Sequence, residues 1–359
     1  MKAFFKRHLV VHIWALGVLA LFGVYWYGIS STEAANAVSR VTQCLKDGYA
    51  RIWYLFPFSV VEWFYVFFIL GVLAWLAVLL HRLRSWKGKR LEAAYGCLMG
   101  IACLWLTAYG FFCMAWGVNY YADGFQQRSG VYAQPVMAEE LDRVTSWFAQ
   151  RLAETSGLVE RDEAGVFAVP REDIFAASTE VYYNISKEFS FLEREDRIPK
   201  KMFFSRLFSA MNFTGFYSPY TGESNLNVDS PACLLPANIA HELAHQRGIA
   251  SEQECNFLAV AASTASDNSA YQYSGYLMGY IHLGNALYRS NQDRWAELRA
   301  GLPEVVQADL RYHSAYWRQF EGLTATVSKS IYDSSLKSYG QADGIQSYGT
   351  VVDLLVAYY

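Results

Sequence analysis

Long apolar runs with almost no charge occupy the first third of the chain. They cover residues 9–30, 58–80 and 93–118; the first and third contain no charged residue, and the second contains only Glu62. A run of about 20 apolar residues is long enough to cross roughly 30 Å of hydrocarbon as a helix. The pattern therefore predicts three transmembrane helices, which make residues 1–118 a membrane anchor.

From residue 119 onward the pattern changes, and apolar residues recur at spacings of three and four, as in amphipathic helices. Such stretches cover residues 137–157, 171–189, 276–290 and 293–322. Residues 212–235 differ, because they are rich in Gly, Ser, Asn and Pro and contain a short extended candidate, Glu223 to Val228. We predict a mainly α fold, with a mostly helical domain over residues 119–359 that contains a small β element.

Charge is divided between the same two regions. Residues 1–118 hold 11 Lys and Arg against 4 Asp and Glu, whereas residues 119–359 hold 19 against 29. The acidic region has no basic stripe, so nucleic acid is not an expected partner. The loop between the second and third apolar runs contains Arg82, Arg84, Lys87, Lys89 and Arg90. Under the positive-inside rule this loop and the N-terminus lie in the cytoplasm. The expected location is the cell membrane, with a multi-pass anchor in the lipid bilayer and the domain from residue 119 outside the cytoplasm.

One motif in the second region carries recognisable chemistry. Residues 241–245 read His-Glu-Leu-Ala-His, which is HExxH, and Gly248 follows at a place that suits the end of a helix. Two histidines four residues apart share one helix face, so His241 and His245 are predicted to bind one Zn²⁺. Glu242 is then placed to take a proton from a zinc-bound water. The alternative is an ordinary helix with two surface histidines.

A third zinc ligand is expected shortly after the motif. The longer pattern HExxHxxGxxH fails, because Ser251 stands where its last histidine would be. Ser251 is a suitable N-cap for a second helix, and Glu254 would then complete a capping box. Glu252 and Glu254 lie about 200° apart on a helix, so only one of them can face the metal. We predict Glu252 as the ligand, with Glu254 as the alternative.

Other residues near the motif have less defined roles. Asn256 shares the Glu252 face and is predicted to hold a ligand histidine by a hydrogen bond. Tyr217, Tyr220, Tyr276 and His282 are candidates for stabilising an oxyanion. Glu223 to Val228 is a candidate edge strand for binding an extended peptide substrate. Cys233 and Cys255 are predicted to be buried thiols, with a disulfide between them as the alternative.

Three segments together resemble a known family. HELAHQRGIASEQECNFLA, TGFYSPYTGESNLN before it and the C-terminal SYGTVVDLLVAYY are similar to an uncharacterised family of bacterial membrane proteins with proposed zinc-peptidase domains. More distantly, HExxH followed by Glu-x-x-x-Asp is the pattern of gluzincins, such as the membrane CaaX-type proteases and the β-lactam sensor peptidases. Here Glu252 and Asn256 occupy those last two positions. The resemblance implies a zincin-like fold but no particular substrate.

The expected function is a membrane-anchored zinc metallopeptidase that hydrolyses an extracytoplasmic or membrane-adjacent polypeptide. The main alternative is a zinc-binding membrane sensor or scaffold with little or no proteolytic activity, although a purely structural zinc site would not need Glu242. A membrane protein with a helical interaction domain and no metal is a third possibility.

Overall fold

The chain folds into two compact units. The structure is a computed structural model, and it describes residues 2–85, 88, 90–338 and 348–359. The first unit comprises Met1–Ala122 and Pro219–Gly222, and the second comprises Asp123–Ser218 and Glu223–Tyr359.

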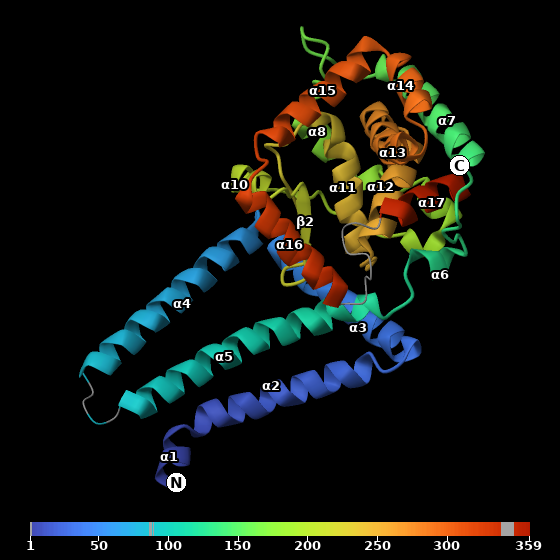
Figure 1. Ribbon diagram of the computed structural model, residues 1–359. Helices are drawn as coiled ribbons and strands as arrows, with labels where there is room; N and C mark the ends of the chain where they lie inside the picture. Colours follow the sequence, from blue (N-terminus) through green and yellow to red (C-terminus); the bar gives the residue numbers. More distant parts are fainter. Residues whose placement is uncertain (1, 86–87, 89, 339–347) are drawn as a thin grey trace. The chain divides into compact units, whose positions relative to one another are not determined.

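Three helices of the first unit are long and apolar enough to cross a membrane, and they mark the chain as a membrane protein. They are α2 (Leu9–Gly28), α4 (Val60–Ser85) and α5 (Arg90–Ala115). A short helix, α1 (Lys2–Arg7), precedes α2, and α2 and α5 run side by side (Figure 1). Lys87 and Lys89 of the predicted cytoplasmic loop lie outside the described residues.

The first unit also contains a helix that the sequence analysis did not predict, α3 (Thr32–Trp53). Its N-cap is Ser31, whose hydroxyl accepts a hydrogen bond from the Ala34 amide. Lys46 of this helix is buried and donates a hydrogen bond to the Ala115 carbonyl at 2.8 Å. This bond pairs the buried ammonium group with a carbonyl at the C-terminal end of α5.

The four residues 219–222 belong to the first unit although they lie far along the chain. The Tyr220 ring stacks on Phe111, with ring centroids 5.6 Å apart, and its hydroxyl donates to the Ala108 carbonyl. Gly222 has a φ of +70°, and a Cβ there would lie 2.7 Å from the Cβ of Ala50. Glycine is therefore required at this position both for its backbone conformation and for the close approach to α3.

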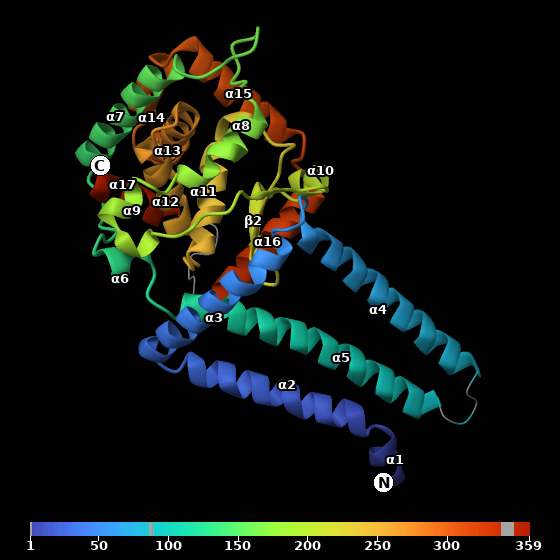
Figure 2. The same cartoon turned by 180° about the vertical axis from the view of Figure 1, so that it is seen from behind.

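The second unit is a helical assembly around one apolar core. Its longer helices are α7 (Ala138–Ser156), α11 (Leu235–Gln246), α12 (Glu252–Ala265), α13 (Ser269–Ser290), α14 (Gln292–Ala300), α15 (Glu304–Arg318), α16 (Leu323–Ser338) and α17 (Tyr348–Tyr358). Both views show α11 and α13 in the interior of this unit, with α7, α14 and α15 around them (Figures 1 and 2). The core side chains of α11, α12 and α13 are almost fully buried. The prediction of a mainly α fold with a small β element is confirmed.

Shorter helices connect these elements. They are η1 (Gly117–Tyr120) in the first unit and, in the second, α6 (Phe125–Ser129), α8 (Arg171–Ala176), η2 (Ala177–Glu180), α9 (Ile185–Glu188), η3 (Ser190–Leu192), α10 (Ser205–Ala210) and η4 (Ala232–Leu234). The helical stretch predicted over residues 171–189 is therefore broken. Ser178 donates its hydroxyl hydrogen to the Phe175 carbonyl, and Tyr182 is buried with its hydroxyl bonded to Ala240. These local and tertiary hydrogen bonds override the helical pattern.

The β element is a sheet of three short strands in the order β1–β3–β2. The strands are β1 (Lys200–Lys201), β2 (Gly215–Ser218) and β3 (Glu223–Leu226). β3 pairs with β1 in parallel and with β2 antiparallel, so it is the central strand. The prediction that residues 223–228 form an edge strand is therefore wrong. The four residues of β3 are fully buried, as expected for a strand with neighbours on both sides.

Candidate metal centre

The HExxH residues lie in the last two turns of α11. Pro236 stands in the first turn of this helix, where its missing amide hydrogen costs no hydrogen bond, as predicted. The chain reverses through Gly248, which has a φ of +80°, and Ser251 then caps α12 by accepting a hydrogen bond from the Glu254 amide. This short connection brings the first residue of α12, Glu252, back against the histidines of α11.

Three side chains converge at this point, as the sequence predicts. The Nε2 atom of His241 lies 3.2 Å from Oε2 of Glu252, and Nε2 of His245 lies 3.5 Å from Oε1 of the same carboxylate. One ligand atom from each residue lies within 4.8 Å of the others. Ligands about 2.1 Å from a tetrahedral Zn²⁺ are about 3.4 Å apart, so these spacings fit the ion.

The second nitrogen of each imidazole is also engaged. Nδ1 of His245 donates to the Ile249 carbonyl at 2.9 Å, and Nδ1 of His241 donates to Oδ1 of Asn256 at 3.0 Å. The hydrogen bond predicted for Asn256 is confirmed. Because a carbonyl can only accept, the proton of a neutral His245 must be on Nδ1, which leaves the lone pair of Nε2 directed at Glu252.

Charges in the cluster are strongly coupled. Burial would raise the pKa of Glu252, but His245 and His241 hold that pKa well below its ordinary value. Burial would conversely lower the pKa of His245, yet the Glu252 carboxylate raises it well above its ordinary value. The Glu252 carboxyl group is therefore held in its ionised form. A divalent cation would compete with protons for these ligand atoms.

Glu242 is buried beside this cluster and does not belong to it. Burial raises its pKa to about 7, although the nearby histidines act in the opposite direction. Among the described residues no hydrogen-bond partner exists for its buried Oε2 atom. A Cβ added at Gly215 of β2 would lie 2.8 Å from its Oε1 atom. Glu242 is thus a carboxyl group with an unsatisfied oxygen, packed against the backbone of β2.

Glu254 has a different role from those considered in the sequence analysis. Its carboxylate accepts hydrogen bonds from the backbone amides of Phe125 and Gln126, at 2.7 and 3.1 Å. These amides open α6, so the Glu254 carboxylate caps the N-terminus of that helix. The predicted capping box within α12 is therefore only half correct, because Ser251 caps as expected while the Glu254 side chain turns away. No sequence signal pairs residue 254 with residues 125 and 126.

Of the four candidates for an oxyanion helper, His282 has an electrostatic connection to the cluster. Burial lowers the pKa of His282 to about 4, and the charge of His241 acts in the same direction. Tyr276 is a core residue in contact with Trp147 and Phe148, and Tyr220 belongs to the first unit. Tyr217 lies in β2 and is partly buried.

Both cysteines near the motif are free, buried thiols, as predicted. The Cys255 thiol donates to the Ile249 carbonyl at 3.4 Å and lies 3.3 Å from Nδ1 of His245. Burial raises the pKa of Cys255 to about 12, so the group is a neutral thiol. No sequence pattern indicates that the Cys255 thiol lies beside His245. It depends on the loop 247–251 placing one carbonyl between two side chains.

Comparisons with known proteins give one result. No curated protein and no solved structure matches the chain. A family model matches residues 39–356, which include most of α3, all of α4 and α5 and nearly the whole second unit, and it is described as "Protein of unknown function (DUF3810)". The match covers far more than half of the sequence, including the HExxH segment and Glu252. The chain belongs to the DUF3810 family.

Proposed function

We propose that this protein is a membrane-anchored zinc metallopeptidase that hydrolyses peptide bonds of an extracytoplasmic or membrane-adjacent polypeptide. The observation that carries the proposal is the convergence of Nε2 of His241, Nε2 of His245 and the Glu252 carboxylate within 4.8 Å. If two histidines and a glutamate met only by chance, the far side of each imidazole would not need a hydrogen-bond acceptor. Here both imidazoles also donate from Nδ1 to fixed oxygen acceptors, as histidine ligands of metals commonly do.

In this proposal His241, His245 and Glu252 would hold zinc, which would supply Lewis-acid activation of water and of a peptide carbonyl. Glu242 supplies the proton transfers. Its carboxylate, whose Oε2 has no hydrogen-bond partner in the described part of the chain, accepts a proton from the attacking water and passes it to the nitrogen of the leaving amine. A pKa near 7 suits a group that must both accept and release a proton at neutral pH.

Strand β2 replaces residues 223–228 as the proposed binding strand for substrate. It pairs with β3 on one side only and is an edge of the described sheet. Its first residue, Gly215, packs against Glu242. A peptide that adds to β2 on the side away from β3 by main-chain hydrogen bonds would therefore run beside the proposed general base.

The proposal also assigns this chemistry to one side of the bilayer. Three crossings, with the Arg82–Arg90 loop and the N-terminus in the cytoplasm, would put the second unit on the opposite side of the membrane. The positive charge of residues 1–118 supports this orientation.

The decisive experiment is Glu242→Gln, which keeps the shape of the side chain and removes its basicity. Purified full-length protein would be incubated with a library of short synthetic peptides, and the cleavage products would be identified by mass spectrometry. We expect zinc content to stay near that of the wild type while cleavage slows by about 10²-fold or more. Glu163→Gln, a matched change at an exposed glutamate, should alter neither.

Two outcomes would contradict the peptidase. Equal cleavage by the wild type and Glu242→Gln would show that Glu242 is not the group that transfers the proton. A zinc-loaded wild type that cleaves no peptide, together with a Glu242→Gln strain whose phenotype matches the wild type, would favour the sensor or scaffold.

A further inference from the structure

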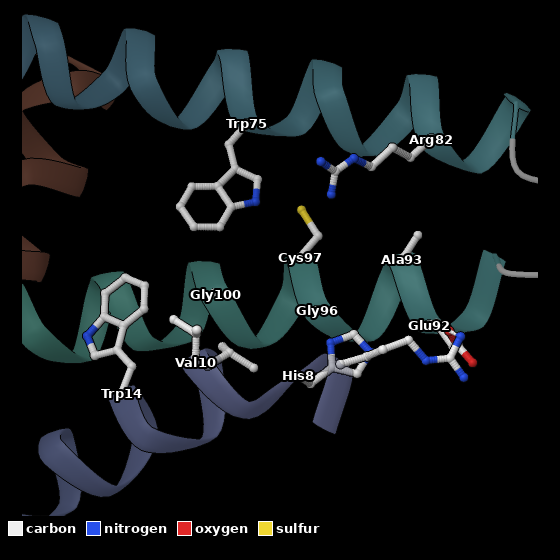
Figure 3. Close-up of a pocket in the computed structure, with 12 residues that line it drawn as sticks. His8, Val10, Trp14, Trp75, Arg82, Glu92, Ala93, Gly96, Cys97 and Gly100 are labelled. Atoms are coloured by element: carbon white, nitrogen blue, oxygen red, sulfur yellow. Dashed lines mark ion pairs between the residues drawn. The ribbon is translucent and has the colours of Figure 1, made fainter. Parts of the chain in front are cut away.

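A cavity of about 560 Å³ lies between the membrane helices of the first unit, at the end where α2 begins, α4 ends and α5 begins. Side chains from all three helices, and from the residues just before α2, line it (Figure 3). Its lining combines cationic groups at one end with apolar groups over the rest. This cavity is separate from the metal centre and plays no part in the proposed hydrolysis.

The polar end is formed by Arg7, His8, Arg82 and Glu92. Arg7 forms an ion pair with Glu92 at 2.8 Å, and Arg82 adds a second guanidinium group to the lining. The Arg82 side chain runs alongside α4, with its guanidinium group on the side of α4 that faces α5 (Figure 3). Nε2 of His8 is buried and has no hydrogen-bond partner among the described residues. The lining therefore carries a net positive charge and an unsatisfied polar nitrogen.

The rest of the lining is shaped by aromatic rings and two glycines of α5. A Cβ at Gly96 would lie 3.0 Å from the His8 ring, and one at Gly100 would lie 2.4 Å from the Trp75 ring. The two rings therefore pack directly on the α5 backbone. Trp75 and Cys97 face each other across the space between α4 and α5 (Figure 3). The apolar window of α4 is not buried in the protein, so in a bilayer this space is open to lipid.

We propose that this cavity binds an anionic phospholipid, with the phosphate at Arg82 and His8 and the glycerol and acyl chains along Trp75 and the α4–α5 groove. Arginine binds phosphate through charge-assisted hydrogen bonds, and a histidine nitrogen adds one more. Basic pockets between transmembrane helices are suited to lipid headgroups. An inorganic phosphate ion would occupy only a small part of 560 Å³ and would leave the apolar walls without a partner.

The test measures binding of phosphatidylglycerol to the full-length protein in detergent by native mass spectrometry, with phosphatidylcholine and inorganic phosphate as comparison ligands. Arg82→Gln should weaken phosphatidylglycerol binding about tenfold. Arg84→Gln is the matched control, because Arg84 is on the same helix, is exposed and does not line the cavity. It should change binding by less than about twofold.

A second variant keeps the proposal testable if Arg82→Gln does not fold. His8→Phe retains a ring on Gly96 but removes Nε2, and it should weaken phosphatidylglycerol binding several-fold. Equal binding by Arg82→Gln and Arg84→Gln, or by His8→Phe and the wild type, would overturn the proposal. So would equal affinity for phosphatidylcholine, or complete displacement of the lipid by millimolar phosphate, which would assign the cavity to a free anion.

Discussion

At the scale of single residues, the nitrogens that face away from the proposed metal matter as much as those that face it. Asn256 accepts from Nδ1 of His241 and fixes the ring so that Nε2 faces Glu252. Asn256→Ala should lower zinc affinity by about 10- to 100-fold without removing a ligand. Asn256→Asp should restore it, because a carboxylate is a stronger acceptor. Competition with a zinc chelator measures both variants, and unchanged affinity in Asn256→Ala would contradict the role of this hydrogen bond.

Substitutions of the two glutamates at the start of α12 should have different effects. Glu252→Gln should weaken zinc retention and turnover together, because it removes a proposed ligand charge. Glu254→Gln should retain zinc but lower the free energy of unfolding by about 1–3 kcal/mol, because an amide cannot accept from the Phe125 and Gln126 amides with both of its terminal atoms. Zinc analysis and thermal unfolding of both proteins provide the measurement. Loss of zinc from Glu254→Gln alone would show that the ligand assignment is wrong.

At the residue scale, the sequence predicted the members of the cluster but not the groups that surround it. The positions of His241, His245, Glu252 and Asn256 follow from helical spacing over fewer than twenty residues. The Ile249 carbonyl shared with Cys255 depends on the path of a loop. The Glu254 cap on α6 depends on a contact between residues about 130 positions apart. Neither has a periodic signal in the sequence.

At the scale of elements, the glycines of α13 decide how closely it approaches α7. A Cβ at Gly279 would lie 2.2 Å from the ring of Phe148, which is completely buried and cannot move aside. A Cβ at Gly284 would meet nothing closer than 3.7 Å. Gly279→Ala should therefore cost about 1–3 kcal/mol by overpacking. Gly284→Ala should be neutral or stabilise by up to about 1 kcal/mol through helix propensity. Thermal unfolding compares them, and equal midpoints would contradict the close packing.

Long periodic helices were predictable, and short or amphipathic connecting elements were not. The stretch 137–157 became α7 almost residue for residue because its apolar face packs mainly on one long helix, α13. Helix α3 was missed because it lies between two much stronger apolar runs and has a polar composition. The order of the strands could not be read from residues 223–228 alone. The pairing partner of β3 on its second side, β1, contains only two residues.

At the scale of the whole molecule, the uneven distribution of charge along the chain predicts its membrane topology. Residues 1–118 carry a net positive charge and residues 119–359 a net negative one. A reporter fused after Gly88 should therefore behave as cytoplasmic, and one fused after Gly124 as exported. Paired phosphatase and fluorescent-protein fusions measure the two positions. The reverse labelling would contradict the proposed extracytoplasmic site.

The central claim is that HExxH and Glu252 form a zinc site, and metal analysis tests it most directly. The measurement is the zinc content per chain of the purified full-length protein, by mass spectrometry of the metal, beside His241→Ala and His245→Ala. The account predicts about one zinc per chain in the wild type and loss of most of it in each variant. A wild type without zinc, or stoichiometric zinc that survives both substitutions, would contradict it.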